Sequence, residues 1–135
     1  MHCPLLFVYG TLRRNTGKKM PGLLAGYSDF IGYATFQGKL YEIDDYPGAT
    51  PSGCPSDLVH GEVYHLREPD FLLPRLDEYE ECGLGHPEPA EYSRELREVR
   101  LICGKAVAAW IYLYNRPTDK LKLMPSGDFI HLENH

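Results

Sequence analysis

The sequence predicts an α+β protein in which short strands dominate and one short helix is present. The 135 residues include 13 glycines and 11 prolines, which interrupt the chain at short intervals, as turns between strands do. Only residues 67–81 have the apolar spacing of a helix. The length and the hydrophobic content of 43% fit a single domain over residues 1–135, with no linker or internal repeat.

Two segments read as strands of the core. Residues 5–9 (LLFVY) form an uninterrupted apolar run, which is typical of a strand covered on both faces. Residues 59–66 (VHGEVYHL) alternate, so that Val59 and Val63 face one way while Glu62 and Tyr64 face the other. Both segments are predicted to belong to one curved, largely antiparallel sheet.

The remaining strands are predicted from composition and turn residues. Residues 30–43 place aromatic and β-branched side chains around Gly32 and Gly38, as a strand with a bulge or a tight bend does. Residues 96–102 and 106–114 are rich in β-formers and are separated by a short turn that contains Gly104. This pair predicts a hairpin.

A proline interrupts the segment that is predicted to be helical. Leu72, Leu76 and Tyr79 recur at i, i+4 and i+7, and Pro69 suits a first helical turn. Pro74, however, falls in the middle, where a proline removes one backbone hydrogen bond and crowds the preceding turn. We therefore expect a short or kinked helix.

Charge and cysteine usage limit the functional classes. A formal net charge of −5 argues against nucleic acid or an anionic membrane as the main partner. No apolar run approaches the ~20 residues of a membrane span, and the first residues do not resemble a secretory signal, so we expect a cytoplasmic protein. The four cysteines lack a C-x-x-C pair and are expected to be free thiols, and no His or Cys spacing predicts a metal site.

An acidic cluster follows the predicted helix. Asp77, Glu78, Glu80 and Glu81 surround Tyr79, and on a helix Glu80 would lie near the apolar side. A carboxyl group on a buried face is a candidate general acid or base, because burial disfavours its charged form. From spacing alone, a solvated acidic helix end is the favoured explanation of the cluster.

A set of motifs, taken together and in order, resembles the gamma-glutamylcyclotransferase-like family, in particular its avirulence-induced-type, gamma-glutamylamine cyclotransferase-like branch. The motifs cover nearly the whole chain: FVYGTL (7–12), GKLYEIDDYPG (38–48), HGEVYHL (60–66), LDEYEEC (76–82), YSRELREV (92–99), AWIYLYN (109–115) and SGDF (126–129). The resemblance implies a compact, mostly antiparallel β-barrel with one or two short flanking helices.

The resemblance also implies an activity. The α-amine of a γ-glutamyl amine or amide would attack its own γ-carbonyl, releasing 5-oxoproline and a free amine by intramolecular acyl transfer, with no cofactor or metal. Glu80, the last acid of LDEYE, would be the catalytic acid and base. The main-chain amides of Gly10, Thr11 and Leu12 would hold the substrate's α-carboxylate, since glycine lets a ligand approach the backbone.

Three tyrosines complete the implied substrate site: Tyr9 as part of its wall, Tyr92 at its border and Tyr114 near the catalytic carboxyl. Packing in the core is the alternative for Tyr92 and Tyr114. The chain departs from the family at Glu81, where a glycine is usual. Two alternatives stay open, a noncatalytic module that binds an amino-acid-like molecule and a hydrolase that uses Cys82 with His86. The sequence fixes neither the leaving amine nor the oligomeric state.

Overall fold

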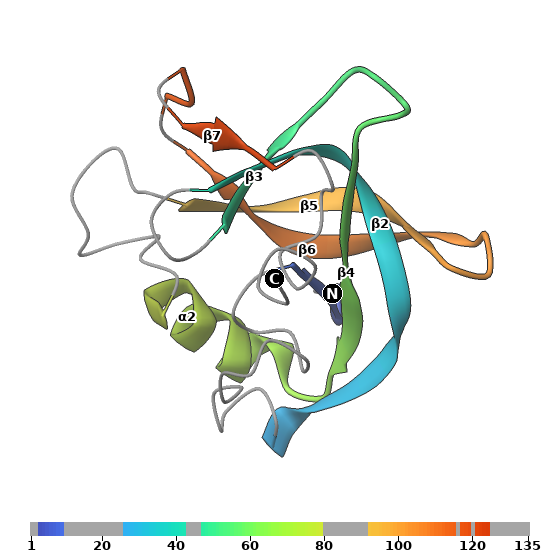
Figure 1. Ribbon diagram of the computed structural model, residues 1–135. Helices are drawn as coiled ribbons and strands as arrows, with labels where there is room; N and C mark the ends of the chain where they lie inside the picture. The colour runs from blue at the N-terminus through green and yellow to red at the C-terminus, as the bar shows by residue number, and fades with distance from the viewer. Residues whose placement is uncertain are drawn as a thin grey trace.

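The computed structural model describes residues 3–9, 26–42, 47–79, 92–115, 117–119 and 121–124. Within these residues, seven strands and one helix follow one another (Figure 1). They are β1 (Leu5–Val8), β2 (Ser28–Glu42), β3 (Pro47–Pro51), β4 (Leu58–Leu66), α2 (Pro69–Tyr79), β5 (Tyr92–Leu101), β6 (Ala106–Tyr114) and β7 (Lys122–Leu123). The four strands predicted as one sheet are confirmed, and so is the short helix with Pro74 inside it.

The strands close into a barrel. β1 pairs with β4, β4 with β2, β2 with β5, β5 with β6, and β6 returns to β1. All these pairings are antiparallel except the last, in which Leu6 lies beside Trp110 in parallel register. β3 adds a second link between β2 and β6. The predicted mostly antiparallel barrel with a flanking helix is therefore confirmed.

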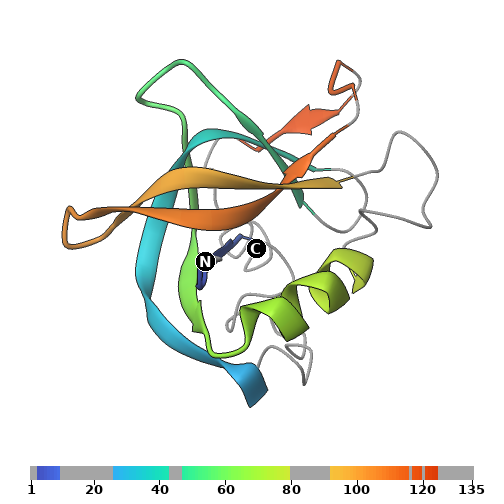
Figure 2. The same cartoon turned by 180° about the vertical axis from the view of Figure 1, so that it is seen from behind.

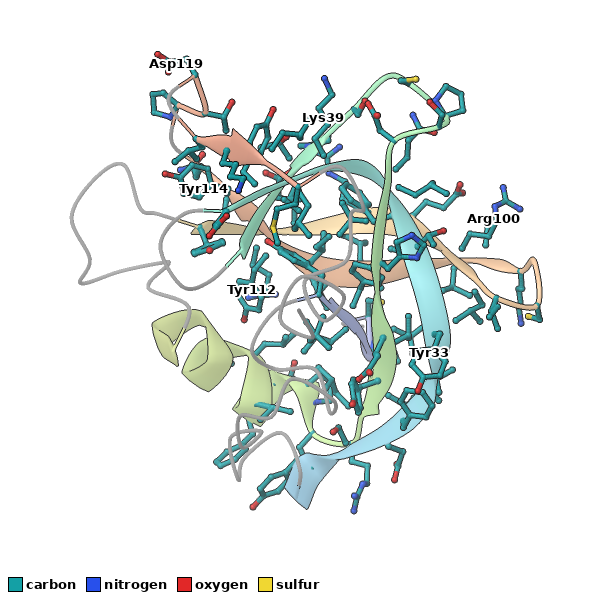
Figure 3. All side chains as sticks on the ribbon, viewed as in Figure 1. Tyr33, Lys39, Arg100, Tyr112, Tyr114 and Asp119 are labelled. Atoms are coloured by element: carbon teal, nitrogen blue, oxygen red, sulfur yellow. The ribbon has the colours of Figure 1, made fainter. Side chains whose placement is uncertain are left out.

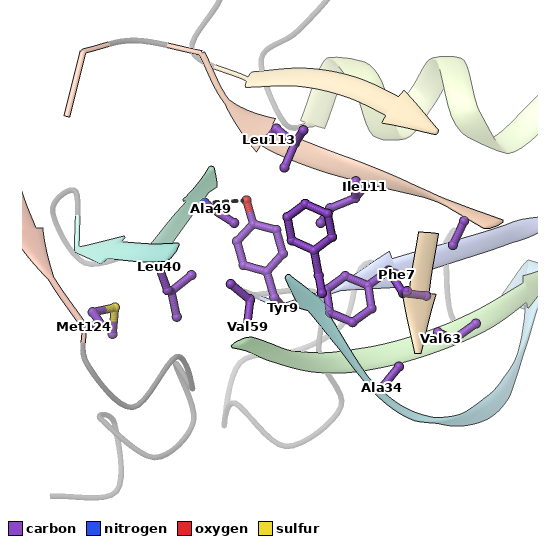
Figure 4. Packing of buried hydrophobic residues seen from close by; sticks show 13 residues of the cluster. Phe7, Tyr9, Ala34, Leu40, Ala49, Val59, Val63, Ile111, Leu113 and Met124 are labelled. Carbon is purple, nitrogen blue, oxygen red and sulfur yellow. Dashed lines mark hydrogen bonds between the residues drawn. The ribbon is translucent and has the colours of Figure 1, made fainter. Parts of the chain in front are cut away.

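Alternation along the strands separates two apolar clusters. On β4, Val59 and Val63 point into the barrel, and Tyr64 and Leu66 point to the side of α2. Figure 4 shows the interior of the barrel, where side chains from opposite walls meet. The interior cluster consists of Phe7, Tyr9, Ala34, Phe36, Leu40, Ala49, Val59, Val63, Val99, Ala109, Ile111, Leu113 and Met124.

A second cluster, here called the helix-side cluster, joins α2 to the outer face of the barrel. Its members are Leu6, Val8, Tyr64, Leu66, Leu72, Leu73, Tyr92 and Tyr112. Leu72 and Leu73 are buried, which is the apolar contact that holds an 11-residue helix too short to be stable alone. α2 lies along one side of the barrel in both views (Figures 1 and 2). α2 is much shorter than a helix that crosses a bilayer. In the described ranges, no helix is long and apolar enough to do so.

The sheet contains one irregularity that the sequence predicted and two short strands that it did not. The register of β2 against β4 shifts between Phe30 and Gly32, which is the irregularity expected near Gly32. β3 and β7 were not predicted, because one is bounded by prolines and the other is only two residues long. Both pair with the C-terminal half of β2, so that long-range pairing, and not local propensity, forms them.

Gly61 provides a test of how closely β1 and β4 approach. A Cβ atom at this position would meet the carbonyl oxygen of Val8 and would lie 2.6 Å from Cζ of Phe7. We expect Gly61→Ala to lower the free energy of unfolding by about 1–3 kcal/mol, because backbone and a core ring must both move. Urea denaturation monitored by circular dichroism measures this change.

Gly32→Ala is the matched control, because nothing lies within 4 Å of a Cβ atom built there. Its stability should stay close to that of the wild type or rise slightly, since alanine restricts the unfolded chain. Equal effects of the two substitutions would contradict the close approach of β1 and β4.

Candidate functional site

The structure describes three of the residues predicted for the substrate site, Tyr9, Tyr92 and Tyr114. The predicted catalytic residue Glu80 and the predicted amide donors of residues 10–12 lie outside the described residues. Their neighbours in the chain are described, however. α2 ends at Tyr79, directly before Glu80, and Tyr9 directly precedes residue 10.

Tyr9 closes a gap in the barrel wall. Along one edge of β6, β1 pairs at Trp110 and β3 pairs at Leu113. The Tyr9 hydroxyl lies between these two points: it donates a hydrogen bond to the carbonyl oxygen of Tyr112 and accepts one from the Ala49 N–H at 3.1 Å (Figure 4). One side chain therefore ties the end of β1 to both β3 and β6.

This arrangement gives Tyr9 a positioning role. Its ring belongs to the interior cluster, its side chain is buried, and its hydroxyl already bonds two backbone groups. Buried backbone groups that lose their partner cost free energy, so this hydroxyl is held firmly. The backbone that leads into residues 10–12 therefore starts from a fixed point, while direct contact of Tyr9 with substrate stays a prediction.

Tyr92 and Tyr114 form a pair. They are opposite one another in the β5–β6 register, and their rings meet edge to face, with centroids 5.9 Å apart and planes at 76°. Tyr92 is buried in the helix-side cluster, and Tyr114 is half-buried against it. Figure 3 shows Tyr114 near the end of β6, with Tyr112 closer to α2. Two predicted border residues are thus neighbours.

The helix-side cluster links the elements that lead to both undescribed parts of the site. Val8 of β1 and Leu72 and Leu73 of α2 belong to it, together with Tyr92 of the tyrosine pair. The strand that precedes residues 10–12 and the helix that precedes Glu80 are therefore packed against each other. This side of the barrel is the candidate functional site.

Glu62 is a buried acid that the sequence did not single out. Among the described residues, Glu62 is the one charged side chain that is buried, with 0% of its surface exposed. Its Oε1 accepts a hydrogen bond from the Tyr64 hydroxyl at 2.8 Å. It lies opposite Val8 in the β1–β4 register. The alternation of β4 placed Glu62 on the face of Tyr64, but nothing local indicated that this position is buried.

The described cysteines are free thiols, as expected, and Cys82 and His86 of the hydrolase alternative lie outside the described residues. Cys54 is exposed between β3 and β4, and its Sγ lies 3.0 Å from Oγ of Ser56, which lowers the pKa of the Cys54 thiol. Within the described ranges, no three His, Cys, Asp or Glu side chains form a group that could hold a metal ion.

Both hydrogen bonds of the Tyr9 bridge use its hydroxyl group, so a substitution that removes only this group tests the bridge. We expect Tyr9→Phe to lower the free energy of unfolding by about 1–3 kcal/mol, because the Ala49 N–H and the Tyr112 carbonyl both lose a partner inside the protein. Urea denaturation measures the loss. Tyr33→Phe is the control, since 44% of the Tyr33 side chain is exposed, and it should change the stability by no more than about 0.5 kcal/mol. Unaltered stability of Tyr9→Phe would contradict the bridging role.

Comparison with known proteins points to one protein family. The family model described as "Gamma-glutamyl cyclotransferase, AIG2-like" matches residues 6–131. The chain is 35% identical over 125 residues to the gamma-glutamylcyclotransferase family protein YtfP of Escherichia coli (strain K12), with 93% of this chain and 95% of that protein covered. It is 32% identical over 133 residues to ytfP of Citrobacter rodentium, with 96% and 98% covered.

Solved structures agree with these sequence matches. The solution structure of ytfP from Escherichia coli superimposes with a TM-score of 0.62 at 34% identity, over 92% of this chain and 94% of that one. An AIG2-like protein from Mus musculus superimposes with a TM-score of 0.69 at 23% identity, over 93% and 88%, and shares the fold. The chain therefore belongs to the gamma-glutamyl cyclotransferase, AIG2-like family.

Proposed function

We propose that this protein is a γ-glutamyl cyclotransferase that converts a γ-glutamyl amine or amide to 5-oxoproline and a free amine. The observation that carries the proposal is the family match over residues 6–131, because this range includes both Glu80 and residues 10–12. The packing of β1 against α2 in the helix-side cluster supports it, since these two elements lead directly to the two segments.

The reaction requires two proton transfers. The substrate's α-ammonium, with an ordinary pKa of about 8, must lose a proton before its nitrogen can attack the γ-carbonyl carbon. A new C–N bond closes the five-membered ring, and the bond to the departing amine breaks when that nitrogen receives a proton. In our proposal the Glu80 carboxyl accepts the first proton and returns one to the leaving nitrogen.

Substrate orientation is assigned to the segment after β1. In the proposal, main-chain N–H groups of residues 10–12 hold the α-carboxylate, and the fixed position of Tyr9 sets where this segment begins. The pair of Tyr92 and Tyr114 borders the same site and limits the conformations of the glutamyl moiety. These residues thus bring the α-amine and the γ-carbonyl of one molecule together.

The activity is tested with a panel of γ-glutamyl compounds whose leaving groups are an alkylamine, the lysine side chain and cysteinylglycine. We expect 5-oxoproline from at least one of them, detected by mass spectrometry. Running the assay in ¹⁸O-labelled water separates the mechanisms, because cyclisation leaves 5-oxoproline unlabelled while hydrolysis gives labelled glutamate. An N-acetylated substrate, which lacks a free α-amine, should not react. Binding without any product would favour the noncatalytic module.

Glu80→Gln tests the assignment of the catalytic residue. Glutamine keeps the size of the side chain but cannot accept and return a proton at neutral pH, so we expect kcat to fall by about 10²–10⁴ with little change in KM. The measurement is the rate of 5-oxoproline formation at equal folded concentration, with folding checked by thermal melts.

Three further glutamates serve as controls. Glu78→Gln and Glu81→Gln should retain most activity, because we expect both side chains to point to solvent. Glu62→Gln should also retain turnover, since the Glu62 side chain has no exposed surface through which to meet a substrate, and glutamine can still accept the Tyr64 hydrogen bond. Near wild-type activity of Glu80→Gln, or loss of activity in Glu62→Gln alone, would contradict the assignment.

A further inference from the structure

Among the described residues, the β5–β6 hairpin has one long strand edge with few strand pairings. β5 pairs with β6 from Tyr92 to Arg100, but on its other edge it meets β2 only at Arg100 and Leu101. From residue 95 to residue 99 this second edge has no strand partner in the described part of the chain. The hairpin projects from the barrel, with β5 facing away from α2 (Figures 1 and 2).

The hydrogen-bonding direction of each β5 residue follows from the hairpin end. The Leu101 N–H donates to Lys105 on the β6 side, at 2.8 Å, and the Ile102 N–H donates to Tyr33 on the β2 side, at 3.0 Å. Because successive residues of a strand turn their backbone groups to alternate edges, Leu96 and Glu98 point to the same edge as Ile102. This is the open edge, where unpaired backbone groups can template a further strand.

The side chains along this edge have a symmetry of their own. Residues 94–98 read Arg-Glu-Leu-Arg-Glu, so that each charge has the opposite charge at the same distance on the other side of Leu96. Leu96 itself, at the centre of this charged segment, is 48% exposed. Glu95 and Arg97 are also accessible, and Arg97 turns back along its own strand to contact Glu95 at 2.5 Å.

We propose that two copies of this chain pair through their β5 edges, antiparallel about a twofold axis at Leu96. Leu96 then faces Leu96 of the second copy, and their backbone groups exchange hydrogen bonds across the new junction. Glu95 falls opposite Arg97, and Arg94 falls opposite Glu98. Opposite charges on directly facing residues stabilise a strand pair.

The charge pattern selects this register among its alternatives. A twofold axis at Glu95 would place two glutamates face to face, and an axis at Arg97 would place two arginines face to face. Charged side chains on an edge strand commonly prevent pairing with another molecule. Here they repel in the two adjacent registers and attract when the axis lies at Leu96, so they favour the Leu96-centred mode over its neighbours. The proposal does not rest on the cyclotransferase activity, because residues 95–98 are not assigned to the substrate site.

Sedimentation velocity over a concentration series tests the pairing. The wild type should move from the 15.4 kDa monomer towards twice this mass as its concentration rises. Arg97→Glu should raise the dissociation constant about tenfold or more, because two facing pairs of opposite charge become two pairs of like charge. The double variant Glu95→Arg/Arg97→Glu restores facing opposite charges and should return the dissociation constant to within about threefold of the wild type.

Lys105→Glu is the matched control, since it makes the same change of net charge at an exposed position in the adjacent turn and should leave the dissociation constant unchanged. Thermal melts verify that each variant is folded. A wild type that stays monomeric up to about 1 mM overturns the proposal. It is also overturned if Arg97→Glu leaves the dissociation constant of the dimer unchanged, or if the double variant does not return it towards the wild-type value.

Discussion

The hydroxyl group of Tyr9 determines how this barrel is completed. β6 must be paired along one edge by two strands, β1 and β3, that do not reach each other. The hydroxyl satisfies one backbone group on each side of the gap, at Ala49 and at Tyr112. Without it, two buried polar groups would lie in an apolar interior, which proteins avoid. The continuity of the wall, and the direction in which the chain leaves β1, both depend on this contact.

The two faces of the wall have different chemical characters. The inner face is filled by aliphatic and aromatic side chains, as expected of a barrel too narrow to enclose a ligand. The outer face beneath α2 combines leucines with tyrosine hydroxyls and the Glu62 carboxyl. Polar groups are therefore held in place on the side where the helix packs, and a reaction site at this side can draw on a rigid support.

Local sequence patterns predicted much of the fold, because alternation on β4 and the glycine turn before β6 are short-range signals. Barrel closure was implied only by the family resemblance, since the contact of Leu6 with Trp110 leaves no local trace. The same limit applies to the site. Glu80 and residues 10–12 were assigned from the resemblance, because spacing alone fits a solvated helix end and a plain turn. The burial of Glu62 depends on tertiary contacts that the alternation of β4 does not show.

The parallel contact between β1 and β6 also constrains how the protein is made. Tyr9 and Tyr112 are 103 positions apart, so the ribosome has synthesised most of the chain before β1 can contact β6. Until then, among the described strands, β1 has β4 as its one pairing partner. Non-local closure of this kind slows folding and prolongs the exposure of apolar, aggregation-prone segments. The nascent chain therefore spends much of its synthesis with an open barrel wall and with its interior side chains accessible to solvent.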